Sequence, residues 1–130
     1  MTVKFAQSLD GRIATSTGDS QWISGDSALR LAHKLRREHD AIMVGIGTVL
    51  ADDPQLTVRL LKGRDPLRVI VDSRLRTPPH ARVLADGAAA GTLIATAATI
   101  DRDRAREIQK LGVEILRLPA GPYGSGIDIE

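Results

Sequence analysis

The sequence contains no cysteine, which excludes disulfide bonds, cysteine-ligated zinc and thiol catalysis. Aromatic side chains are also scarce, because Phe5, Trp22 and Tyr123 are the only three in the chain. Proteins that bind single-stranded nucleic acid need aromatic side chains on which bases stack. The formal net charge is only +2, too small for an electrostatic attraction to phosphate backbones. The composition therefore predicts a protein that does not bind nucleic acid.

Long apolar runs are missing as well. No stretch approaches the roughly 20 residues that a membrane-spanning helix needs, and the first five residues lack the apolar centre of a signal peptide. The three histidines, His33, His39 and His80, lack the spacing of a metal site, and we interpret them as structural or solvated. We expect a cytoplasmic protein without a metal site or a membrane segment.

The chain has 130 residues, enough for one domain with a hydrophobic core and too few for two. Apolar residues in short runs or in alternation predict strands, and apolar residues with a period of 3.6 predict helices. The expected strands are residues 2–8, Ala41–Gly45, Leu67–Val71, Leu93–Thr96 and Val113–Leu118. The expected helical segments are one capped by Ser24 that runs to about His39, a turn at Gly47–Ala51, and Asp101–Leu111 with Gly112 after its end.

Strands that alternate with helices require crossover connections, which favour a parallel sheet. The sequence therefore predicts a single α/β domain with a mainly parallel central sheet. Two regions contribute no expected element. The segment Ala85–Gly91 is rich in small residues and is interpreted as a surface loop, and the tail from Pro119 to Glu130 is rich in glycine.

Gly45-Ile46-Gly47-Thr48 follows the second expected strand. Glycines at that point let a ligand approach the backbone, and the next N–H groups can meet a phosphate. The third glycine of a dinucleotide-binding fingerprint is absent, so a plain tight turn is an equal alternative.

Asp72-Ser73-Arg74 follows the third expected strand. Ligands of parallel sheets bind outside the carboxyl ends of the strands, where a hydroxyl beside a guanidinium suits a phosphate. An acid at such a position usually binds a free ribose hydroxyl, so we expect Asp72 to turn inward and brace the loop. The alternative for the whole tripeptide is an ordinary exit from a strand.

Other polar residues are ambiguous by themselves. In the pair Asp52-Asp53, one carboxylate can anchor the loop while the other faces a ligand, or both are capping and solvated residues. Arg36 and Arg59 suit phosphate or carboxylate, although a single arginine is usually a surface charge. Trp22 either fills the core or covers a flat ring.

In chain order, these segments resemble one known family. They are Lys4-Phe5-Ala6-Gln7-Ser8-Leu9-Asp10-Gly11-Arg12, Gly18-Asp19-Ser20-Gln21-Trp22-Ile23-Ser24, the stretch from Val44 to Arg59 (VGIGTVLADDPQLTVR), and Pro66-Leu67-Arg68-Val69-Ile70-Val71-Asp72-Ser73. Together they resemble the reductase domain of the bifunctional riboflavin-biosynthesis deaminase/reductase. The likeness covers roughly residues 3–118 and implies a three-layer fold like that of dihydrofolate reductase.

The resemblance also implies an activity. Members of the family use NADPH to reduce the ribose of a ribosylamino-pyrimidine 5′-phosphate to a ribityl chain, and they commonly form homodimers through a sheet edge. Family positions that contact the cofactor correspond to Ala6, Trp22, Thr48, Asp52 and Ser73; Gly45, Gly47 and Arg74 join them from the reasoning above. Family positions that contact the substrate correspond to Ser20, Arg36, Leu56 and Arg59.

Lys4 and Asp52 are the candidates for acid–base or electrostatic help at the reacting carbon, and water is a third candidate for the proton donor. The family also has a later strand and a Glu-Gly-Gly-like loop that nothing in this chain matches, so we expect a domain that is incomplete at its C-terminus. Two alternatives stay open: a non-catalytic nucleotide-binding remnant of this domain, and a related reductase that acts on another pterin or pyrimidine.

Overall fold

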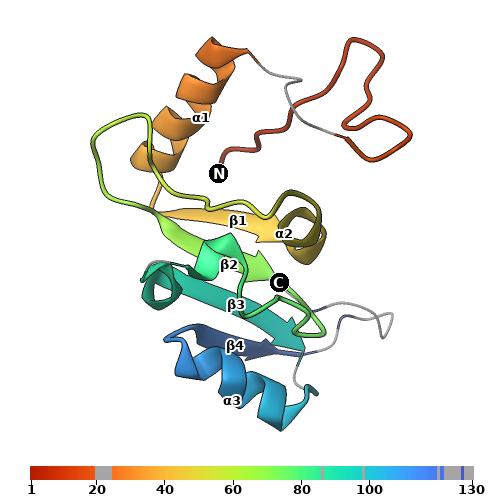
Figure 1. Ribbon diagram of the computed structural model, residues 1–130, viewed down its shortest axis with the longest axis vertical. Coiled ribbons are helices and arrows are strands. Elements are labelled where there is room, and N and C mark those ends of the chain that lie inside the picture. The colour runs from red at the N-terminus through yellow and green to blue at the C-terminus, as the bar shows by residue number, and fades with distance from the viewer. Residues whose placement is uncertain (20–24, 86, 98, 120, 122–126, 128–130) are drawn as a thin grey trace.

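The computed structural model describes residues 1–19, 25–85, 87–97, 99–119, 121 and 127. Its helices and strands alternate along the chain (Figure 1). In chain order they are α1 (Asp26–Glu38), β1 (Ala41–Gly45), α2 (Ile46–Asp52), β2 (Leu67–Val71), two 3-10 helices, η1 (Arg82–Leu84) and η2 (Ala88–Gly91), β3 (Thr92–Ala97), α3 (Arg102–Lys110) and β4 (Glu114–Leu118).

The four strands form one sheet in the order β1-β2-β3-β4, and every neighbouring pair is parallel. In the register of the sheet, Val44 lies beside Ile70, and Ile70 lies beside Ile94. The predicted α/β class with a mainly parallel sheet is confirmed. β1 and β2 have the predicted bounds. β3 is one residue longer than predicted at each end, and β4 begins one residue later than predicted.

The hydrophobic core lies on one face of this sheet. Ile70 and Ile94 are fully buried on that face and pack with residues of the segments that connect the strands. These segments contribute Val49 from α2, Val83 from η1 and Ile108 from α3. Parallel strands in sequential order are joined by crossovers of the same hand, so the connecting segments collect on the same face.

Side chains on the opposite face are less covered, because successive residues of a strand point to opposite sides of a sheet. Met43, Leu67 and Leu116 all point to this second face and are 61%, 41% and 43% exposed. Ala95, near the middle of the sheet, is buried there. Within the described residues the second face is therefore mainly apolar, with Glu114 of β4 as an exception, and it is open toward both edge strands.

Local interactions mark both ends of α3, whereas α1 begins without a side-chain cap. In α3, the Asp101 carboxylate accepts hydrogen bonds from the N–H groups of Asp103 and Arg104, at 2.8 and 3.0 Å, which caps the first turn. Gly112 follows the end of that helix with φ +97°, a conformation that favours glycine. In α1 the N-cap residue is Gly25, not the predicted Ser24, which itself lies outside the described residues.

Two predictions about secondary structure were wrong. Residues 2–8 alternate in polarity but form no strand; Val3 and Phe5 are 74% and 65% exposed and pair with no other strand. A strand needs hydrogen-bond partners for its backbone N–H and C=O groups, and an alternating pattern of polarity does not provide such partners. Ala85–Gly91 is more structured than a surface loop, because η2 lies within it and Ala89 is buried in the core.

Candidate functional site

The carboxyl ends of the strands meet at one edge of the sheet, as they must when all strands are parallel. At the end of β1, Gly45 caps α2, and Gly47 and Thr48 occupy the first turn of that helix. A side chain placed on Gly45 or Gly47 would meet no atom within 4 Å, so the space beside their backbone is open. The predicted glycine pair therefore lies where a ligand can approach the main chain.

The loop after β2 is organised by one buried carboxylate. Asp72 is completely buried and accepts hydrogen bonds from the backbone N–H and the hydroxyl of Thr77, at 2.7 and 2.9 Å. The loop between them includes Leu75, whose φ is +53°. Our expectation that Asp72 turns inward and braces the loop is confirmed. Ser73 and the exposed Arg74 are thereby held at the exit of the strand.

The adjacent carboxylates Asp52 and Asp53 have different surroundings. Asp53 follows α2 in the left-handed conformation, with φ +40°, and its Oδ1 accepts the backbone N–H of Arg82 at 2.8 Å. This bond ties the end of α2 to η1, so Asp53 is the carboxylate of the pair that anchors the loop. Asp52 is the last residue of α2 and is exposed.

Two arginines far apart in the sequence meet at one residue. Arg36, in the last turn of α1, donates from Nη1 to the carbonyl of Thr57 at 3.2 Å. Arg59 donates from Nη1 to the hydroxyl of the same threonine at 3.1 Å. Leu56, the residue before Thr57, has φ +57° and its side chain is buried in the core. Three of the four predicted substrate positions therefore lie on or beside one short segment.

His33 belongs to this group, although its sequence pattern predicted no functional role for it. Its side chain is only 5% exposed, and its Nδ1 accepts the backbone N–H of Arg59 at 3.1 Å. A backbone N–H can only donate, so Nδ1 carries no proton. Burial lowers the pKa of His33, and the positive charges of Arg36 and Arg59 lower it further. Burial and the charge of Arg59 also lower the pKa of Arg36.

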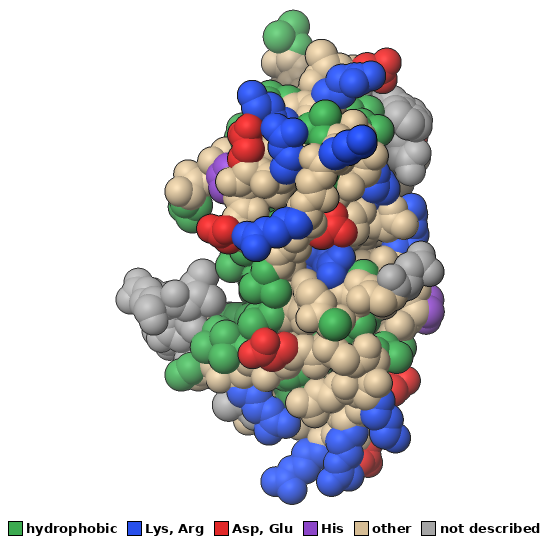
Figure 2. Space-filling model, turned by 90° about the vertical axis from the view of Figure 1, so that its left-hand side faces the viewer, with side chains coloured by type: hydrophobic (Ala, Val, Ile, Leu, Met, Phe, Trp, Pro, Cys, Tyr) green, Lys and Arg blue, Asp and Glu red, His purple; other side chains and the backbone are tan. Residues whose placement is uncertain are grey.

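Lys and Arg side chains gather over the α1 end of the molecule, with a second group over α3 at the opposite end (Figure 2). In the first group, Lys34 and Arg37 on α1 lie close to Glu38, at 3.9 and 3.8 Å. The ion pairs of the described residues include neither Arg36 nor Arg59. These two positive charges therefore have no carboxylate partner in the described part of the chain.

Other predicted site residues do not join either group. Lys4 and Ala6 lie on the N-terminal segment, where Lys4 is exposed and Ala6 is half-buried. Ser20 and Trp22 lie outside the described residues. No hydrogen bond or ion pair between described residues links the Arg36–Arg59 pair to Gly47, Thr48 or Ser73.

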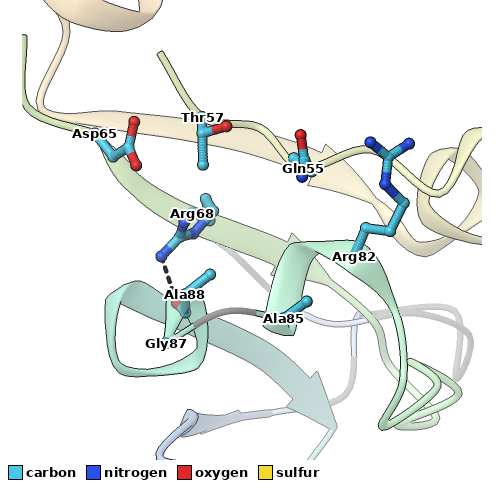
Figure 3. A pocket seen from close by; sticks show the side chains of 8 residues that line it. All are labelled: Gln55, Thr57, Asp65, Arg68, Arg82, Ala85, Gly87 and Ala88. Carbon is cyan, nitrogen blue, oxygen red and sulfur yellow. Dashed lines mark hydrogen bonds between the residues drawn. The ribbon is translucent and has the colours of Figure 1, made fainter. Parts of the chain in front are cut away.

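A pocket of about 230 Å³ lies on the core side of β2, among residues that the sequence analysis did not select (Figure 3). Arg68 forms part of its wall, and Gln55 and Thr57 contribute from the loop after α2. Arg68 is 4% exposed, donates from Nε to the Thr92 hydroxyl at 3.1 Å, and donates from Nη2 to the carbonyl of Ala88. The signal available in the sequence was a charged residue inside an otherwise apolar strand, Leu67-Arg68-Val69-Ile70-Val71.

Comparison with known proteins identifies the family. Residues 1–129 match the family described as the RibD C-terminal domain. The chain belongs to the RibD C-terminal domain family. The solved structure of Acinetobacter baumannii RibD is similar to this chain, with 36% sequence identity and a TM-score of 0.73. The similar region covers 88% of this chain and 32% of the Acinetobacter protein chain. This likeness supports the fold like that of dihydrofolate reductase, which the resemblance implied.

Two relatives are similar in sequence to this RibD C-terminal domain. The 2,5-diamino-6-ribosylamino-4(3H)-pyrimidinone 5′-phosphate reductase of Methanothermobacter thermautotrophicus is 55% identical over 108 residues, which are 81% of this chain and 49% of that protein. The riboflavin biosynthesis protein RibD of Bacillus amyloliquefaciens is 46% identical over 119 residues, 91% of this chain and 32% of that protein. The chain thus spans about half and about a third of the lengths of these relatives.

The described part of the chain shows neither a membrane-spanning helix nor a metal-binding cluster. None of its described helices combines the length and the apolar character needed to cross a bilayer. Its described residues also contain no cluster of three or more histidine, aspartate or glutamate side chains arranged to hold a metal ion.

The buried carboxylate of Asp72 allows a stability prediction. Asp72→Ala leaves the N–H and hydroxyl of Thr77 buried without an acceptor, so we expect a loss of about 1–3 kcal/mol in the free energy of unfolding. The control is Arg76→Ala, because the exposed Arg76 lies 3.9 Å from Asp72 and should contribute less than about 1 kcal/mol. Urea unfolding measures both variants, and equal losses would contradict the bracing role of Asp72.

The lowered pKa of His33 allows a prediction about pH. The folded protein binds its proton less readily than the unfolded chain does, so this contribution to stability is complete above the ordinary pKa of 6.5 and is lost as the pH falls below it. His33→Asn should flatten the dependence of unfolding free energy on pH in that range, while His39 and His80 stay the same in both proteins. Identical pH profiles for the two proteins would count against this assignment.

Proposed function

We propose that the chain carries the substrate- and cofactor-binding part of an NADPH-dependent reductase, which converts the ribose of a ribosylamino-pyrimidine 5′-phosphate to a ribityl chain. The observation that carries the proposal is the pair Arg36 and Arg59, held together at Thr57 without a carboxylate partner among the described residues. Two guanidinium groups in this arrangement suit the phosphate of such a substrate.

The substrate phosphate would bind between these two guanidinium groups and orient the rest of the molecule. Binding energy at a remote phosphate is useful because it positions a reacting carbon elsewhere in the substrate. Leu56 presents no polar group, and its buried side chain fixes the segment that leads to Thr57 and Arg59. We assign Ser20 to the same substrate site from the family resemblance alone.

The cofactor would lie along the carboxyl edge of the sheet, where the open space beside Gly45 and Gly47 fits a close approach to the backbone. Thr48 offers a hydroxyl there, and Ser73 and Arg74 offer donors at the neighbouring strand end. Because Asp72 is turned into the protein and accepts hydrogen bonds from Thr77, its carboxylate does not face a phosphate bound at that exit. These features suit NADPH, which differs from NADH by one phosphate. Ala6, Trp22 and Asp52 complete the proposed cofactor set.

The reaction is addition of a hydride to C1′ of the opened sugar and of a proton to the attached nitrogen, which converts a C=N bond to a C–N bond. NADPH supplies the hydride when it is bound. The protein must orient the two partners and place a proton source near the nitrogen. Asp52, at the end of α2, and Lys4 are the side chains we propose for acid–base or electrostatic help, and water is the alternative proton donor.

The wider biological assignments are proposals of the same kind. We propose a homodimer in the cytoplasm that acts on a small phosphorylated pyrimidine and binds neither nucleic acid nor membrane. Whether reduction precedes or follows deamination of the pyrimidine is decided by comparing turnover of the diamino-pyrimidinone and the amino-uracil forms of the substrate. A pterin-preferring profile would instead favour another reductase of the same fold.

The arginine pair gives a kinetic prediction. Arg36→Ala and Arg59→Ala should each weaken substrate use by about tenfold or more, because each removes a charge-assisted hydrogen bond worth about 1.5–3 kcal/mol. NADPH affinity should change little in either variant. Steady-state kinetics with both reactants varied, and NADPH titration by fluorescence, make the comparison, with Arg30→Ala on α1 as the control. A variant that altered only NADPH affinity would contradict the assignment.

The exit of β2 gives a prediction about cofactor choice. Replacing Ser73 and Arg74 together by alanine should weaken NADPH binding by roughly 2–4 kcal/mol and leave NADH binding nearly unchanged. Titration of the wild-type and variant proteins with each cofactor makes the test. Equal losses for both cofactors would mean that the pair only supports the fold. No loss for either would place the 2′-phosphate elsewhere, with Thr96 at the next strand end as the first alternative.

A further inference from the structure

The contacts at Thr57 require α1 and the loop after α2 to keep a fixed position relative to each other. Arg36 reaches the Thr57 carbonyl from α1, whereas Arg59 reaches the Thr57 hydroxyl from within the loop itself. Both guanidinium groups can face one anion only if the loop keeps its place against the helix. Arg36 alone does not ensure this, because its long side chain has many rotamers and makes one hydrogen bond to the loop.

The second link between helix and loop is His33. It lies one turn before Arg36, so both side chains are on the same face of α1. Its ring is short and nearly completely buried, and its Nδ1 accepts the N–H of Arg59 itself. The hydrogen bond therefore fixes the main chain from which the second guanidinium extends.

The nature of the acceptor matters as much as its position. An aspartate or glutamate could also accept the Arg59 N–H, but its negative charge would compete with a phosphate for the two arginines. A neutral imidazole accepts the same bond and leaves both positive charges available. The lowered pKa of His33 agrees with a ring that stays neutral beside Arg36 and Arg59.

We propose that His33 is a positioning residue for the phosphate site, in which its unprotonated Nδ1 holds the backbone of Arg59 so that Arg36 and Arg59 face the same anion. This inference rests on the proposed function and deepens it. The proposal gives His33 no contact with the substrate. It concerns the placement of the loop, which the family resemblance leaves unassigned.

Two substitutions separate the hydrogen bond from the packing of the ring. In His33→Asn, the amide oxygen can occupy the place of Nδ1 and accept the same N–H. In His33→Leu, the volume is kept approximately but the acceptor is lost. Ile108→Val, at a core position of α3, is the matched control for a modest loss of stability away from the site.

The first measurement is hydrogen exchange at the Arg59 amide, followed by NMR in the absence of ligand. His33→Leu should speed this exchange by about tenfold or more relative to wild type, and His33→Asn should restore most of the protection. The Ile108→Val control should leave the exchange rate unchanged. Unchanged exchange in His33→Leu would overturn the proposed link.

The second measurement is the affinity for ribose 5-phosphate, a simple phosphate monoester, determined by calorimetry on the same proteins. We expect His33→Leu to bind it about tenfold more weakly, with His33→Asn within about threefold of wild type. Wild-type affinity in His33→Leu, or an equal loss in both variants, would overturn the positioning role and leave the proposed function intact. No measurable binding by the wild type would overturn the phosphate site itself and the role of His33 with it.

Discussion

All four strands of the sheet run in the same direction and follow one another in chain order, and this single constraint determines where the core and the candidate site lie. Connections between such strands must return over a face of the sheet, and here α2, η1, η2 and α3 pack on the same face. The fully buried isoleucines of β2 and β3 lie beneath them. The carboxyl ends of the strands consequently meet at one edge, where the glycine-rich start of α2 follows β1 and the Asp72–Arg74 segment follows β2.

Electrostatics make the second group of residues unusual. Holding two guanidinium groups at one threonine, with no carboxylate partner among the described residues, costs free energy because like charges repel and Arg36 is partly removed from water. A phosphate between them would reverse the sign of this interaction. The free protein thus keeps an unfavourable charge interaction that a bound anion would relieve, and the neutral His33 avoids adding a third positive charge. This pattern agrees with the phosphate site that we propose.

Much of the fold was predictable from local patterns. Apolar runs located the four strands of the sheet, and Asp101 and Gly112 marked the ends of α3 with little error. The prediction of a strand at residues 2–8 was wrong, because an alternating pattern in one segment does not show whether a second strand is present to pair with it. The core role of Ala89 was missed because its small side chain carries little hydrophobic signal, and only the close approach of η2 to the sheet buries it.

The candidate site was predictable in parts. Residues next to strand ends, such as Gly47 and Ser73, follow from topology, since the ends of parallel strands share one edge. The meeting of Arg36 and Arg59 at Thr57 depends on how the loop folds back on α1, which no local pattern encodes. His33 was interpreted as structural or solvated for the same reason. Its hydrogen-bond partner is the backbone N–H of Arg59, and every residue type except proline has such a group, so the sequence does not indicate this contact.

The arginine buried in β2 has a consequence for how the family can vary. Arg68 occupies a core position and joins β2 to the Thr92 hydroxyl of β3 and to the main chain of η2. An apolar residue at 68 would leave the Thr92 hydroxyl and the η2 main-chain carbonyl without the hydrogen bonds that Arg68 donates to them. An apolar residue at 92 would leave the buried guanidinium with one acceptor fewer. Lysine cannot reproduce the two-sided contact of the planar guanidinium. Drift at these two positions is therefore coupled, and an arginine–threonine pair should persist or disappear together as relatives diverge.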